Sequence, residues 1–91
     1  MLNKIFDLFC SRSFISLKRE DSLKTYYITE VYYNNYNSMF INLQKIDSDE
    51  PTFSLHINGT ESLVLNFTPE SGMILKLLNS KTEIKFDNIV K

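Results

Sequence analysis

The segment from Tyr26 to Ile46 constrains the fold most, because it holds two long runs of aromatic and β-branched residues separated by Asn34-Asn35. Such residues favour extended strands, and Asn tolerates the positive φ of a tight two-residue loop. The sequence therefore predicts a long β-hairpin that turns at Asn34-Asn35, with Tyr33 paired to Tyr36.

The predicted register divides this hairpin into two faces, because successive side chains of a strand point to opposite sides. One face is mostly apolar and is expected to face the core; it carries Tyr26, Ile28, Glu30, Tyr32, Asn37, Met39, Ile41 and Leu43. The other face carries Tyr27, Thr29, Val31, Tyr33, Tyr36, Ser38, Phe40, Asn42 and Gln44. Its aromatic rings predict either a covering helix or strand, or a binding surface. A loop longer than two residues would exchange the two faces.

Two shorter elements precede the hairpin. Leu2, Ile5, Phe6 and Phe9 lie at i, i+3, i+4 and i+7, which predicts an amphipathic helix ending near residue 11, with Cys10 as a small buried residue. The alternation of apolar residues in 13–19 predicts a first strand, and the polar residues 19–22 predict a turn after it.

A second hairpin is expected between Phe53 and Phe67, because Asn58-Gly59 is a strong short-range hairpin signal. A three-residue loop that includes Ile57 would place the apolar residues of both strands on one face. These residues are Phe53, Leu55, Leu63, Leu65 and Phe67. His56 would then lie on the polar face, exposed to solvent.

The segment 69–79 has two interpretations. Thr68-Pro69-Glu70 is typical of a helix start, and Met73, Ile74, Leu77 and Leu78 would form one face of that helix. Gly72 disfavours a helix, and the same residues could form a strand of a third hairpin turning at 79–80. The helix is the prediction, followed by a last strand over 82–86.

These elements predict an α+β fold: a small, mainly antiparallel sheet of five to six strands, an N-terminal amphipathic helix and a second helix near 69–79. The 91 residues are expected to form a single domain, 1–91.

The composition excludes several kinds of catalytic and metal site. Two glycines, one histidine and one cysteine cannot form a phosphate-binding loop or a zinc cluster. A calcium loop starting at Asp47 would need Gly and Glu where the chain has Thr52 and Asn58. Cys10 and His56 are expected on different surfaces, so the sequence predicts no enzyme, no metal and no cofactor.

The first ten residues form an apolar run interrupted by Lys4 and Asp7, which predicts neither an export signal nor a membrane span. With a single cysteine, the chain is expected to be cytoplasmic.

The charge distribution suggests what the hairpin binds. Residues 27–68 contain one basic residue, Lys45, and five acidic ones, which gives a local charge of −4 within a total of −1. We therefore expect a non-enzymatic protein-binding module whose partner has a basic surface. The predicted anchors are Tyr27, Tyr33, Tyr36 and Phe40, and the predicted acidic rim is Glu30, Asp47, Asp49 and Glu50.

Small chains of this kind are often phage or mobile-element inhibitors, which suggests a host defence nuclease or other nucleic-acid-binding machinery as the target. The alternatives are a structural or self-assembling virion component, and a single-stranded nucleic-acid binder that stacks bases on its rings. The last requires cations around the rings, and the hairpin offers Lys24 and Lys45 at its far end.

Overall fold

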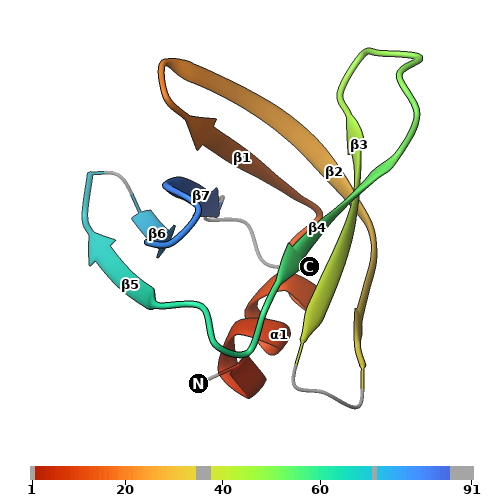
Figure 1. The fold of residues 1–91 in the computed structure, drawn as a ribbon. Helices are drawn as coiled ribbons and strands as arrows, with labels where there is room; N and C mark the ends of the chain where they lie inside the picture. Colours follow the sequence, from red (N-terminus) through yellow and green to blue (C-terminus); the bar gives the residue numbers. More distant parts are fainter. Residues whose placement is uncertain (1, 35–37, 71, 87–91) are drawn as a thin grey trace.

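The computed structural model describes residues 2–34, 38–70 and 72–86, which contain seven strands and one helix (Figure 1). The elements in order are α1 (Leu2–Cys10), β1 (Phe14–Arg19), β2 (Ser22–Tyr33), β3 (Met39–Lys45), β4 (Phe53–Ile57), β5 (Leu63–Thr68), β6 (Gly72–Leu77) and β7 (Thr82–Phe86).

All seven strands belong to one antiparallel sheet with the order β4-β3-β2-β1-β7-β6-β5. Strands adjacent in the sequence pair with each other, except β4 and β5, which form the two edges. The sheet curls so that these edges border the open side of a half-barrel (Figure 1). The fold is thus an up-and-down meander, joined through β1 and β7 and open between β4 and β5.

The helix α1 packs on the concave side of the sheet, against β2 and β3 (Figure 1). Ile5 and Phe9 are fully buried, and the Phe9 ring meets the Phe86 ring edge-on at 4.9 Å. The rest of the core comes from alternate residues of the strands, as expected for a sheet with one covered face. The amphipathic helix, the first strand and the last strand predicted from the sequence are therefore confirmed.

The predicted α+β class is wrong, because the described chain is mostly β and residues 72–77 form a strand instead of a second helix. Gly72 has φ of 75°, which no right-handed helix accommodates. From there Leu75 and Leu77 alternate inward, and their strand pairs with β5 and β7. The alternative interpretation, a strand in a hairpin that turns at 79–80, is the correct one.

The predicted two-residue loop at 34–35 is also wrong. Tyr33 pairs with Met39, so residues 34–38 separate the strands, and a bulge between Ile28 and Glu30 shifts the register once more. Tyr26, Ile28, Met39, Ile41 and Leu43 lie on the core side as predicted, whereas Tyr32 and Glu30 do not.

The predicted hairpin of 53–67 does not form, because β4 pairs with β3 and β5 pairs with β6. The assignment of faces was nevertheless correct: Leu55 faces the core and His56 is exposed. Cys10, expected to be buried, is exposed at the end of α1. Within residues 2–34, 38–70 and 72–86, no helix combines the length and apolarity needed to cross a membrane.

Candidate interaction surface

Three aromatic rings stack across the convex face of the sheet. Tyr32 on β2, Phe40 on β3 and His56 on β4 are direct neighbours in the register. The Tyr32 and Phe40 ring centroids are 5.3 Å apart with planes 17° from parallel, and those of Phe40 and His56 are 4.5 Å apart at 7°. We call this row the ring ladder; Phe40 is half-buried, and Tyr32 and His56 are exposed.

The bulge in β2 brings Tyr32 into the ring ladder, whereas the pairing of β3 with β4 places Phe40 beside His56. Thr29 is the extra residue, and its hydroxyl donates a hydrogen bond of 3.1 Å to the carbonyl oxygen of Asn42. An extra residue reverses which side chains point outward beyond it. Tyr27 and Tyr32 therefore both lie on the convex face although they are separated by an odd number of positions.

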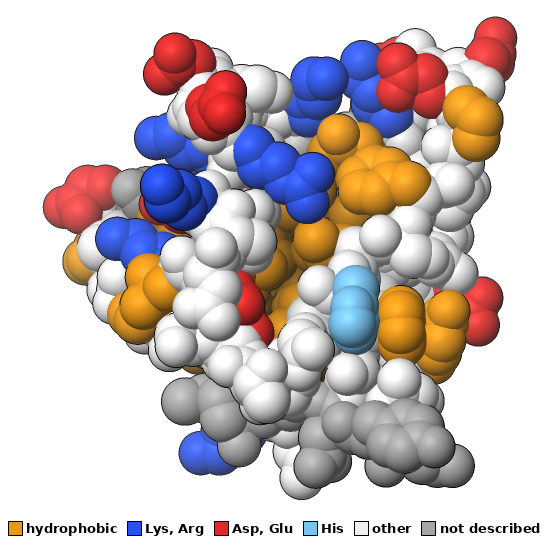
Figure 2. Space-filling model, viewed as in Figure 1, with side chains coloured by type: hydrophobic (Ala, Val, Ile, Leu, Met, Phe, Trp, Pro, Cys, Tyr) orange, Lys and Arg blue, Asp and Glu red, His pale blue; other side chains and the backbone are white. Residues whose placement is uncertain are grey.

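A polar row borders the ring ladder. The Asn42 amide donates a weak 3.5 Å hydrogen bond to the Glu30 carboxylate, and the Ser54 hydroxyl donates to the Asn42 side-chain oxygen. Figure 2 shows the histidine (pale blue) with hydrophobic side chains stacked beside it and an acidic group next to them. The described outward positions of β2, β3 and β4 contain no Lys or Arg, so Glu30 gives this face a negative charge.

The predicted anchors do not all lie together. Phe40 is the centre of the ring ladder, and Tyr27 is exposed on the same face but opposite Gln44, toward the other end of β3. Tyr36 lies outside the described residues.

Tyr33 points to the opposite side from the ring ladder. Its ring packs against Phe6 of α1 at 4.7 Å, so it belongs to the interface between helix and sheet. Its hydroxyl is buried without a hydrogen-bond partner among the described residues. Burial, assisted by the charge of Asp7, raises the pKa of the Tyr33 phenol above its ordinary value of 10.0.

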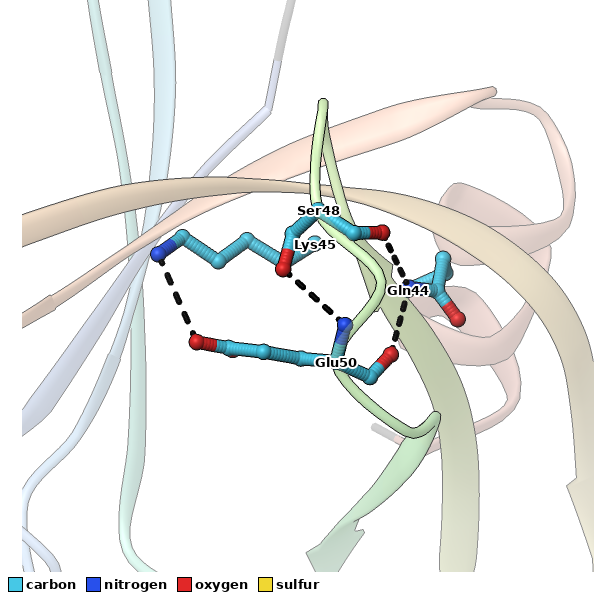
Figure 3. A network of polar contacts seen from close by, with 4 residues as sticks. All are labelled: Gln44, Lys45, Ser48 and Glu50. Atoms are coloured by element: carbon cyan, nitrogen blue, oxygen red, sulfur yellow. Dashed lines mark hydrogen bonds and ion pairs between the residues drawn. The ribbon is translucent and has the colours of Figure 1, made fainter.

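The acidic loop between β3 and β4 is held by a polar network (Figure 3). The Gln44 amide donates hydrogen bonds to the carbonyl oxygens of Ser48 (3.2 Å) and Glu50 (2.7 Å). The Glu50 carboxylate lies 3.8 Å from the Lys45 ammonium. The predicted rim residues Asp47, Asp49 and Glu50 are all exposed, and the Glu50 charge is partly neutralised by Lys45.

This loop does not border the ring ladder. It follows Lys45, and Phe40 lies near the other end of β3. With a rise of about 3.3 Å per residue, about 16 Å separate the two positions along the strand. The structure therefore brings Glu30 to the rings but leaves Asp47, Asp49 and Glu50 at a distance.

Two members of the ring ladder were missed by sequence reasoning. Tyr32 was assigned to the core because the loop was taken as two residues long, and His56 was placed correctly on the outer face but without neighbours. The bulge at Thr29, which places Tyr32, follows no local motif, and the pairing of β3 with β4 places His56 beside Phe40.

Within residues 2–34, 38–70 and 72–86, no cluster of His, Cys, Asp or Glu could hold a metal ion. A hollow of about 730 Å³ lies between the β1–β2 and β6–β7 turns, and its lining consists of Lys18, Arg19, Glu20, Ser22, Ser80, Lys81 and Glu83. Comparisons with protein-family models, with curated proteins and with solved structures found no match to the chain.

Proposed function

We propose that this chain is a non-enzymatic module that binds another protein through the ring ladder and the carboxylate of Glu30. The observation that carries the proposal is the stack of Tyr32, Phe40 and His56, held in register by three strands and open to solvent. Rings fixed in this way offer a large contact area at little entropic cost, which is why aromatic residues are favoured at interfaces.

The charge of this face supports a partner with a basic surface. Glu30 lies beside the rings and Asp47 and Asp49 lie farther along the same hairpin, while the described outward positions of β2–β4 carry no cation. Complementary potentials favour encounter with a positively charged groove and disfavour nucleic acid itself. A nuclease or another nucleic-acid-binding protein is the partner class that best meets this requirement.

The test is affinity capture from a bacterial extract with the full chain and with a Tyr32→Ser, Phe40→Ser double variant. We expect the wild type to retain a basic protein that the double variant loses, and salt to release it. The captured protein should lose nucleic-acid binding when the chain is added. Circular dichroism and thermal unfolding establish that each variant is folded before it is compared.

Leu23→Ser is the matched control, because Leu23 is also exposed on β2 but lies far from the ring ladder. A partner lost equally from the Leu23 variant, or retained by the double variant, would contradict the proposal. Capture of nucleic acid in place of protein would contradict it as well.

A further inference from the structure

The inner side of β5 exposes large apolar side chains. Leu65 and Phe67 are paired with Leu75 and Met73, so they point to the core side of the sheet. Nevertheless Leu65 is 42% exposed and Phe67 69% exposed, whereas Leu55 on the opposite edge strand is only 5% exposed. Side chains directed toward the core therefore remain uncovered along β5.

The backbone edge of β5 is equally unprotected. β5 pairs with β6 on one side and with no described strand on the other. Its sequence, LVLNFT, contains neither a charged residue nor a proline. Proteins usually protect a free edge with such residues, since a free edge otherwise pairs with another extended segment.

The charged side chains at inward strand positions are all basic, and one of them, Lys45, is already paired with Glu50. Inward positions of the described strands carry Arg19, Lys24 and Lys45 and no carboxylate. Arg19 and Lys24 also line a cavity of about 110 Å³ together with Leu17, Ser22 and Tyr26. These cations project from β1–β3, the wall across the half-barrel from β5 (Figure 1).

Figure 2 looks into the open side of the half-barrel. Hydrophobic atoms lie at the bottom of the hollow between the two edges, and Lys and Arg side chains, with acidic ones near them, lie along its upper rim. A ligand for this hollow must therefore offer apolar groups, negative charge and hydrogen-bonding groups for a strand edge.

We propose that the β5 edge accepts an extended, acidic segment of a partner protein, which adds to the sheet as a further strand. Its backbone pairs with β5, and its inward apolar side chains cover Leu65 and Phe67. An inward carboxylate of the same segment faces Arg19 and Lys24 across the hollow. This site is separate from the ring ladder, and its partner has the opposite charge.

Charge complementarity favours such a segment over a second copy of β5. The strand itself is uncharged and is flanked by Glu61 and Glu70. A second copy of β5 would bring no carboxylate of the strand itself to the inward Arg19 and Lys24, whereas a segment with an inward carboxylate would.

The experiment uses the full chain with ¹⁵N-labelled amides and a synthetic peptide that has apolar residues at alternate positions and one inward glutamate. We expect the peptide to shift the β5 amide signals and to slow the hydrogen exchange of those β5 amides that do not pair with β6. Phe67→Ser should weaken binding roughly tenfold, as expected for loss of an interface anchor. Val64→Ser is the matched control, because Val64 is exposed on the same strand but pairs with Lys76 on the outer face; it should change binding less than about twofold.

A second peptide carries lysine in place of the glutamate. Lys24→Glu should reverse the preference between the two peptides, whereas Lys18→Glu, an equal charge change on the outer face of β1, should not. The proposal is overturned if millimolar peptide leaves the β5 amides unchanged or if Val64→Ser weakens binding as much as Phe67→Ser. Slow exchange, in the protein alone, of the β5 amides that do not pair with β6 would mean that a second copy or the same chain occupies the edge, and would overturn the proposal too.

Discussion

The two edge strands, β4 and β5, have the same alternation of apolar residues but differ in how much of it is covered. On β4, Leu55 and Ile57 are almost completely buried, whereas on β5 Leu65 and Phe67 are substantially exposed. The helix accounts for part of the difference: α1 packs on β2 and β3, next to β4, and the described residues place no element over β5.

This comparison shows that alternation determines which face of a strand an apolar residue joins, and that packing determines whether the residue is buried. Only burial contributes strongly to stability, at about 25 cal/mol per Å² of apolar surface removed from water. Residues on β5 are therefore available for binding at a small cost to the fold.

The largest difference in stability is expected between alanine variants of two phenylalanines. Phe9 of α1 is fully buried against Phe86, and Phe67 of β5 is the most exposed of the large hydrophobic residues described. We expect Phe9→Ala to lower the free energy of unfolding by about 4 kcal/mol and Phe67→Ala by less than about 0.5 kcal/mol. Urea unfolding followed by circular dichroism measures both. Similar losses would mean that β5 is covered in solution.

A smaller difference is expected within the edge strands themselves. Leu55→Ala should lower the free energy of unfolding by about 3 kcal/mol, because it leaves a cavity in the core. Leu65→Ala removes the same atoms from a site that is partly exposed, so it should cost less than about 1.5 kcal/mol. The same urea titrations provide the values. If Leu65→Ala lowered the free energy of unfolding as much as Leu55→Ala, the contrast between the two edge strands would not hold.

The comparison also explains how much of the fold could be predicted. Leu55 and Leu65 were assigned to the correct face from alternation alone, and α1 from the spacing of Ile5 and Phe9. Which strands pair could not be predicted, because Asn58-Gly59 fits a hairpin locally, whereas β4 and β5 find better-covered partners in β3 and β6. The free energy that favours a local turn is smaller than the free energy gained by burying apolar residues across the whole sheet.

The candidate site was less predictable than the fold, for a related reason. Phe40 was identified as outward-facing, but the bulge at Thr29 brings Tyr32 to its side and turns Tyr33 toward α1. A bulge depends on contacts between strands, here the hydrogen bond from Thr29 to Asn42, and not on a local pattern. One extra residue therefore exchanges two adjacent tyrosines between the core and the surface.

Removing one hydroxyl group from each of these two tyrosines tests the difference between the covered and the uncovered surface. The Tyr33 hydroxyl is buried beneath α1 without a partner among the described residues, so Tyr33→Phe should raise the free energy of unfolding by about 1 kcal/mol. Tyr32→Phe, on the exposed ring ladder, should change it by less than about 0.5 kcal/mol. Destabilisation by Tyr33→Phe would show that the hydroxyl is hydrogen-bonded.

The loss of the free energy of unfolding at alkaline pH should also depend on the burial of Tyr33. In the unfolded chain the Tyr33 phenol ionises near pH 10.0, but burial, followed by the charge of Asp7, raises its pKa in the folded chain. The folded state thus holds the proton more tightly, so its contribution to stability is complete below pH 10.0 and is lost as pH rises toward the higher folded pKa. Urea unfolding between pH 8 and 11 should therefore show a less steep loss for Tyr33→Phe than for Tyr32→Phe. Equal slopes would place Tyr33, like Tyr32, in contact with solvent, and α1 would then not cover this end of β2.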